Sequence, residues 1–497
     1  MDENQIKERG LLNSTPASIA SPETRLDAKY VLSCWLILIA AVFVNIYAAL
    51  ELRVLYADGV FILQQIMENE GFSFPQLSRY YSYFLQQFPT VVAIWLGVDS
   101  IPALIICYGL TTFLLPLLLV SICYFVLPPS SKAFFVFPLL HYLAGTTSAS
   151  FVGISEGPVA AAYFWLLLYL LLFRFERKAW MLLALLVLPV VFLHEVMVFL
   201  APLLAAVAGW RTRQERHKSG VILFALLTMW FLVVAAFQTY FVIYPRDPGN
   251  RSNFFQDLIH LKWLLTMSGQ VNVPALAGLL ALLVILVIAG VALAGQSPQR
   301  TKLVKFQWSL VVGFAVVSFS MVAVTVISEK FITPWMQFAA RNHSALISFP
   351  LALWAIFSTL YPSTTLPWKN QQIISITYIL AVTILLWHVA ATHRWAVYLA
   401  DFRSIQATGH GQLSWKESCE ILPDSRRSNF KNMSWPWTNP SMSILLSPQG
   451  RVTTVIANPD RGGAWVPFDP TNPQALPRSR FFDYGPYLKT IAAANKK

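Results

Sequence analysis

The chain has 497 residues, of which 56% are hydrophobic and only 12% are charged, and its mean hydropathy is +0.56. Soluble domains carry about 25% charged residues, so this composition excludes an ordinary soluble protein and predicts a polytopic membrane protein. A formal net charge of +12 would also suit a nucleic-acid partner. Much of the Lys and Arg stands between apolar runs, where orientation in the membrane explains it, and we expect no nucleic-acid role.

The cysteines and the N-terminal segment add little chemistry. Cys34, Cys107 and Cys123 stand in apolar runs and Cys419 in a polar segment, with neither metal-ligand spacing nor an obvious disulfide pair. Residues 1–29 are polar and mixed in charge, without the apolar core and cleavage pattern of a signal peptide. We therefore expect a mobile cytoplasmic N-terminal tail.

The apolar runs predict an all-α protein with about eleven transmembrane helices, each long enough to cross or nearly cross about 30 Å of hydrocarbon. These runs are, in chain order, 30–50, 101–126, 133–148, 157–173, 179–193, 196–209, 219–243, 273–295, 305–328, 343–361 and 371–391.

Residues 179–209 admit two interpretations. Basic residues flank both ends, which predicts that both ends are cytoplasmic and requires an even number of crossings. Two short helices with His194-Glu195 at their tip meet this requirement. The alternative is one long tilted span, since about 31 helical residues would reach about 46 Å. The flanking basic residues are Arg174, Arg177, Lys178, Arg211, Arg213, Arg216 and Lys218.

With the hairpin, the transmembrane domain is 30–391 and residues 392–497 form a small extracytoplasmic domain. Short alternating runs at 443–448 and 451–459 predict some strands there. In the first outer loop, apolar residues at helical spacing predict an interfacial helix from about 59 to Gly71. A second interfacial helix or a partial insertion is expected within 79–98, whose first residues are rich in aromatics.

Acidic residues gather at the predicted outer ends of the spans. Asp58 stands at the mouth of the first span, followed by Glu156 and by His194-Glu195. One carboxylate could deprotonate a hydroxyl, and two carboxylates with a histidine could hold a divalent cation such as Mg²⁺ or Mn²⁺. Because both uses are open, the sequence predicts no certain cofactor. The alternatives are a solvated loop acid at Asp58 and a helix-start acid facing the helix dipole at Glu156.

Basic residues on the same predicted face could bind a phosphate. Arg341 opens the run 343–361 together with His343, and Arg is suited to a phosphate because its charge is permanent and its donors form a fork. Arg251 and Lys330 are weaker candidates for the same contact. The alternative for Arg341 is a side chain that reaches lipid headgroups at large.

Other polar residues have less specific interpretations. Arg79 with Tyr80 and Tyr81 could touch a sugar or lipid headgroups, since aromatic faces serve both. His141 and His388 lie inside predicted spans, where we expect them to hydrogen-bond neighbours within the bundle rather than to act chemically.

Four of these features in sequence order resemble the GT-C superfamily of integral-membrane glycosyltransferases, which use polyprenyl-phosphate sugars. They are Asp58 after the first span, interfacial helices before the second, acids in short outer loops, and the segment RNHSALISFPLALW beginning at Arg341. The resemblance covers residues 30–391 and is one of architecture. The first loop has Asp-Gly where some branches have paired acids, which leaves metal dependence open.

The resemblance implies a function for the positions that match. Asp58 would take the proton from the acceptor hydroxyl, and Arg341 would bind the donor phosphate. A sugar would pass from a polyprenyl-phosphate donor to a glycan, lipid or protein acceptor on the outer face of a bacterial inner (plasma) membrane. The competing hypotheses are a transporter or lipid-glycan flippase, and a non-catalytic membrane assembly subunit.

Overall fold

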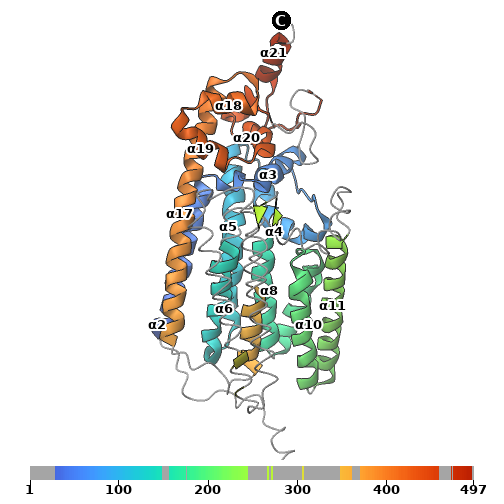
Figure 1. Ribbon diagram of the computed structural model, residues 1–497. Coiled ribbons are helices and arrows are strands. Elements are labelled where there is room, and N and C mark those ends of the chain that lie inside the picture. The colour runs from blue at the N-terminus through green and yellow to red at the C-terminus, as the bar shows by residue number, and fades with distance from the viewer. Residues whose placement is uncertain are drawn as a thin grey trace, which may run out of the picture.

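The chain folds into a lengthwise bundle of helices with a mainly helical cap at one end (Figure 1). The computed structural model describes residues 28–147, 156–174, 176–215, 217–243, 266–267, 270–271, 301, 305–306, 348–360, 370–457, 472 and 474–494.

The bundle is built from the following helical segments, in chain order: α2 (Ala28–Leu50), η2 (Arg53–Leu55), α3 (Asp58–Asn69), η3 (Leu77–Arg79), α4 (Tyr80–Trp95), α5 (Ile101–Val126), η4 (Pro129–Phe135), α6 (Val136–His141), the π-helix η5 (Tyr142–Thr147), α8 (Gly157–Phe173), α9 (Arg177–Val187), η6 (Leu188–Phe192), α10 (Met197–Gln214), α11 (Lys218–Ile243), a helix at Ser348–Leu360, and α17 (Asn370–Thr408). Residues Thr266–Met267 (β1) and Gln270–Val271 (β2) form a short antiparallel pair.

Four of the described helical stretches are long and apolar enough to cross a membrane, which indicates a multi-pass membrane protein. They are Tyr30–Leu50, Ile101–Val126, Lys218–Phe241 and Thr377–Thr408, and three shorter apolar helices are Gly157–Phe173, Trp180–Phe192 and Ser348–Leu360. Each overlaps a predicted span. The predicted span 273–295 lies outside the described residues and 305–328 almost entirely so, and the total of eleven stays a prediction.

Large apolar side chains face outward along these long helices. Phe43, Leu118, Met229 and Ile379 are 57–69% exposed. A soluble monomer rarely exposes such extended apolar surface, whereas a bilayer covers it. The outward-facing residues therefore agree with a membrane environment for the bundle.

The predicted span 133–148 is helical but is not one regular α-helix. It passes from η4 through α6 into the π-helix η5. Pro138 has no backbone N–H for the carbonyl of Phe134, and the hydroxyl of Tyr169 donates to that carbonyl instead. A side chain from α8 thus satisfies the group that the proline leaves open.

The segment 179–209 leaves one end of the bundle and returns to it. α9 continues as η6, the chain turns at residues 193–196, and α10 runs back. Near the end of α10, the Arg211 guanidinium donates to the carbonyl oxygens of Leu171 (3.0 Å) and Arg174 (3.3 Å). Both basic flanks therefore meet at one end of the bundle, as the hairpin requires and one long span does not.

The first loop forms the two helices expected from the sequence, at the opposite end of the bundle (Figure 1). α3 has Asp58 in its first turn and ends at Glu70, a left-handed residue (φ 47°) whose N–H bonds to the carbonyl of Ile66. α4 contains Pro89 and packs against the start of α5. We call this end of the bundle the α3 end.

The cap, residues 409–457 and 474–494, covers the α3 end. Its elements are β3 (Gly411–Leu413), α18 (Trp415–Ile421), α19 (Asp424–Met433), η8 (Pro436–Thr438), α20 (Asn439–Leu445), η9 (Pro448–Gly450), β4 (Thr454–Ile456) and α21 (Gly485–Ala494). β3 and β4 are parallel, with Gly411 opposite Thr454 and Leu413 opposite Ile456. The strand predicted at 451–459 is present as β4.

One expectation about this region differs from the structure. The run 443–448, predicted as a strand, begins in helix α20, where Pro440 at the first turn has a backbone angle already suited to a helix. The boundary at residue 392 falls inside α17, which continues to Thr408 without a break. The cap and the first loop share one hydrophobic cluster that includes Val54, Leu63 and Met442.

Candidate functional site

Arg79 joins two acids from distant segments at the α3 end. Its Nε lies 2.8 Å from Oε2 and 3.1 Å from Oε1 of Glu195, and its Nη1 lies 3.0 Å from Oε2 of Glu156. Glu195 stands in the tip of the α9–α10 hairpin and Glu156 at the start of α8. Charge-assisted bonds of this kind are shorter and stronger than neutral ones, so Arg79 holds three parts of the chain together.

The surroundings of Glu195 keep its carboxyl ionised. Burial alone would raise the pKa of Glu195, but the Arg79 guanidinium, the His194 imidazole and the Ser78 hydroxyl outweigh burial and lower this pKa to about 2. For Arg79, burial lowers the pKa, but the charges of Glu195 and Glu156 raise it well above its ordinary value. Gln238 of α11 donates to the carbonyl of Ser78 (3.1 Å) and steadies this turn.

His194 and Glu195 face each other because the helix is broken between them and α10. Nε2 of His194 lies 3.6 Å from Oε2 of Glu195, and Nδ1 accepts a hydrogen bond from the backbone N–H of Val196 (3.0 Å). When the imidazole is neutral, its proton therefore sits on Nε2, toward the carboxylate. The hairpin tip supplies the break that the sequence required for these neighbours to converge.

Glu156 does more than face a helix dipole. It occupies the N-cap position of α8, yet its side chain makes no capping hydrogen bond there. Only 2% of the side chain is exposed, and the carboxylate bonds to Arg79. The helix-start alternative therefore describes its position in the chain but not its side-chain contact.

Asp58 lies within electrostatic range of the same group of residues. Burial raises the pKa of the Tyr83 phenol well above its ordinary value, and the charges of Glu156, Asp58 and Glu195 raise it further, against the opposing charge of Arg79. We call Asp58, Arg79, Tyr83, Glu156 and Glu195 the Arg79 cluster.

The backbone that carries Asp58 is strained. Ala57, directly before it, has φ 51° and ψ −130°, and Leu52 at the other end of η2 is left-handed at φ 53°. Such conformations cost about 1–3 kcal/mol for a residue with a side chain, and they persist only where surrounding contacts fix them. Asp58 is half-buried, whereas Leu52 and Ala57 are both buried.

The Arg79 guanidinium bonds to two of the three carboxylates of the Arg79 cluster, those of Glu156 and Glu195. The guanidinium lies between Glu156 and Glu195, where a shared divalent cation would need to be. Within the part of the chain that the structure describes, no group of three His, Cys, Asp or Glu residues could hold a metal ion. These residues therefore do not fit a metal, and its presence elsewhere stays a prediction.

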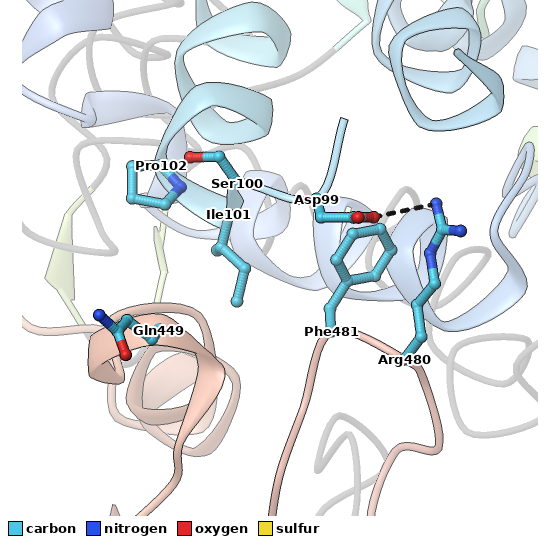
Figure 2. A pocket seen from close by; sticks show the side chains of 7 residues that line it. All are labelled: Asp99, Ser100, Ile101, Pro102, Gln449, Arg480 and Phe481. Atoms are coloured by element: carbon cyan, nitrogen blue, oxygen red, sulfur yellow. Dashed lines mark ion pairs between the residues drawn. The ribbon is translucent and has the colours of Figure 1, made fainter. Parts of the chain in front are cut away.

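A separate cavity of about 620 Å³ lies between the start of α5 and the cap (Figure 2). Arg480 of the cap approaches Asp99 to 3.4 Å at its edge, with the Phe481 ring beside them. None of the predicted site residues lines this cavity, whose remaining wall is Ser100, Ile101, Pro102 and Gln449.

No protein family, curated protein or solved structure matches this chain.

The structure brings some predicted residues together and leaves others outside the described ranges. Asp58, Glu156, His194 and Glu195 all lie at the α3 end. The predicted phosphate ligands Arg341, His343, Arg251 and Lys330 lie outside the described residues.

His141 hydrogen-bonds neighbours within the bundle, as expected from the sequence. The indole N–H of Trp165 donates to its Nδ1 (2.6 Å), and its Nε2 lies 2.6 Å from the hydroxyl of Ser348. Both ring nitrogens are thus used within the bundle. His388 is also fully buried, in α17.

Arg79 is the central residue that sequence reasoning underestimated. It was expected to touch a sugar or lipid headgroups beside Tyr80 and Tyr81, but it binds two acids. Tyr80 packs against Phe74 (4.9 Å between ring centres) and Tyr81 against Tyr163 (5.7 Å). The available signal was an arginine in the first predicted outer loop, on the same predicted face as Glu156 and Glu195, but nothing in the sequence says which acids it contacts.

Proposed function

We propose that this chain is a membrane glycosyltransferase of the GT-C type. It would move a sugar from a polyprenyl-phosphate donor to a glycan, lipid or protein acceptor, with Asp58 as the base. The observation that carries the proposal is the Arg79 cluster, in which Arg79 joins Glu156 and Glu195 from two distant segments at the same end of the bundle as Asp58.

The location of the cluster favours a transferase over a transporter. A transport path requires polar groups or broken helices near the middle of the membrane. Among the described residues, the acids Asp58, Glu156 and Glu195 lie at the α3 end, and mid-bundle His141 uses both ring nitrogens in hydrogen bonds. A lipid-linked donor presents its phosphate and sugar at the level of the headgroups, which is where a site at a bundle end can meet them.

The proposed reaction needs one base and a stabilised leaving group. Asp58 takes the proton from the acceptor hydroxyl, and the acceptor oxygen forms a bond to the anomeric carbon of the donor sugar. The bond from that carbon to the phosphate oxygen breaks, and the polyprenyl phosphate leaves with the electron pair. In this proposal, Glu156 and Glu195, which Arg79 holds, accept hydrogen bonds from sugar hydroxyls.

The negative charge of the leaving phosphate requires a cation. We assign this role to Arg341, with His343, Arg251 and Lys330 as further candidates, because a guanidinium can donate two parallel hydrogen bonds to a phosphate. In the same proposal, the chain has about eleven spans in a bacterial inner membrane. The N-terminus and the end that carries Arg174 and Arg211 are cytoplasmic, and the α3 end and cap lie outside.

The decisive test replaces Asp58 by Asn and follows the glycans and lipids of cells that lack the native gene copy. We expect loss of the glycan product by at least about 100-fold, at normal protein level, because a general base contributes about 10²–10⁴-fold. Glu68→Gln is the matched control, since Glu68 is an exposed acid on the same helix α3.

Near-normal product in Asp58→Asn would end the proposal. If a lipid-linked sugar crosses vesicles that contain the protein and no glycosidic bond forms, the chain is a flippase instead. If the isolated membranes neither transfer nor move the donor but the chain is needed for an enzyme complex, it is an assembly subunit.

A further inference from the structure

The turn before Asp58 is held by aromatic residues from a distant part of the chain. The Tyr56 ring, 2% exposed, lies between Trp395 of α17 and Trp435 of the cap. Its centre is 5.5 Å from that of Trp395, edge to face at 88°, and 5.9 Å from that of Trp435 at 65°. Edge-to-face pairs at this separation are favourable beyond the area they bury.

A hydrogen bond fixes the other side of the same turn. The indole N–H of Trp395 donates to the carbonyl of Glu51 (3.1 Å). Trp395 therefore contacts the chain both before and after the left-handed residue Leu52. Because Glu51 directly precedes Leu52 and Tyr56 directly precedes Ala57, these contacts act beside both residues of this turn that have a positive φ.

The cap also contacts α3 further along its length. Trp437 packs against Phe61 (6.3 Å between ring centres), and the Ser479 hydroxyl donates to the carbonyl of Met67 (2.6 Å). Arg480, seen at the edge of the cavity in Figure 2, approaches Glu70 to 3.5 Å. The contacts thus continue from the turn before Asp58 to the C-terminal end of the helix that Asp58 begins.

We infer that the cap, together with Trp395, is a clamp that positions Asp58. Trp435 and Trp395 are positioning residues, which act through Tyr56 and the strained Ala57 and do not touch the substrate. A strained backbone persists only where surrounding contacts fix it, and the clamp makes these contacts through the Tyr56 ring.

This inference assigns the cap a role that its composition does not reveal. A region rich in tryptophan would ordinarily be expected to stack on sugars. Here the rings of Trp395, Trp435 and Trp437 pack on the Asp58 segment. The catalytic consequence depends on the proposed function, whereas the clamp itself depends only on the contacts.

The test compares two tryptophan variants of the cap in the full-length protein. Trp435→Ala removes a ring from Tyr56. Trp415→Ala is the matched control, because Trp415 stacks on Phe430 (5.3 Å between ring centres). Backbone hydrogen exchange of peptides covering 51–61 should become about tenfold faster in Trp435→Ala and change less than twofold in Trp415→Ala.

Transfer activity then tests what the clamp does for catalysis. In Trp435→Ala we expect kcat to fall about 10–100-fold with little change in the KM for donor, since a misplaced base reduces turnover more than binding. Trp435→Phe, which keeps a ring against Tyr56, should restore most of both readouts. Ala57→Gly in the Trp435→Ala background should restore part of the kcat and part of the slow exchange, because glycine adopts φ near 50° without strain.

The outcomes separate this inference from the proposed function. Equal exchange at 51–61 in Trp435→Ala and Trp415→Ala overturns the clamp. Faster exchange with unchanged transfer overturns the role of the clamp in positioning Asp58 for catalysis. If Trp435→Ala does not fold, Trp435→Phe and Trp435→Leu replace it. Hydrogen exchange at 51–61 that is as slow in Trp435→Leu as in Trp435→Phe then overturns the clamp. If the chain proves not to be a transferase, faster exchange in Trp435→Ala still supports the structural clamp.

Discussion

Removing the Arg79 side-chain charge is the strongest stability test of the Arg79 cluster. In Arg79→Met, the carboxylates of Glu156 and Glu195, 2% and 21% exposed, lose the guanidinium that lies 3.0 and 2.8 Å away. Loss of one partner of a buried ion pair costs about 3–5 kcal/mol. Arg79 is also the strongest of the influences that lower the pKa of Glu195 to about 2, which agrees with a stabilising ion pair.

The pH dependence has an opposite sign in the two proteins. In the wild type, the pKa of Glu195 is lowered in the fold, so its contribution is complete above about pH 4.5 and is lost as the pH falls toward 2. In Arg79→Met, burial raises the pKa of Glu195, so the folded variant gains relative stability when the pH falls. We therefore expect the difference between the two to narrow from pH 7 to pH 4.

The assay is unfolding in mixed detergent micelles, followed by tryptophan fluorescence between pH 7 and pH 4. Arg213→Met, which changes an exposed arginine at the opposite end of the bundle, is the control and should stay within about 0.5 kcal/mol of wild type. Glu156→Gln added to Arg79→Met should recover part of the loss, since it removes one buried charge. A loss below about 1 kcal/mol that does not change with pH would refute the reasoning.

Two further predictions concern positions away from the site. Arg211→Met removes the donors to the carbonyls of Leu171 and Arg174 and should destabilise the protein by about 2–4 kcal/mol. Arg211→Lys lacks the planar fork of donors and should not restore the stability. Wild-type stability in either variant would contradict the role of Arg211 in joining these segments. Gly450→Ala should destabilise the protein by more than about 2 kcal/mol, because φ is +73° there and a Cβ would lie 2.0 Å from the carbonyl oxygen of Phe481. Thermal unfolding of the Arg211 and Gly450 variants measures both effects.

Long apolar runs were sufficient to predict the bundle. A span such as 101–126 must satisfy its backbone groups internally in hydrocarbon, so a helix is the only solution open to it, and the structure has that helix as α5. Basic flanks predicted the hairpin at 179–209 for a similar reason, since few membrane topologies meet the charge rule. The periodic pattern after Asp58 likewise predicted α3 and its end near Gly71.

Only the tertiary structure decided which polar groups meet. Arg79 is separated from Glu156 by 77 residues and from Glu195 by 116, and the sequence contains no pattern that pairs them. The pairing arises because η3, α8 and the hairpin tip reach the same end of the bundle. The position of Tyr56 between Trp395 and Trp435 arises in the same way, from helices whose apolar faces fit together, and side-chain packing of this kind is not encoded in local sequence periodicity.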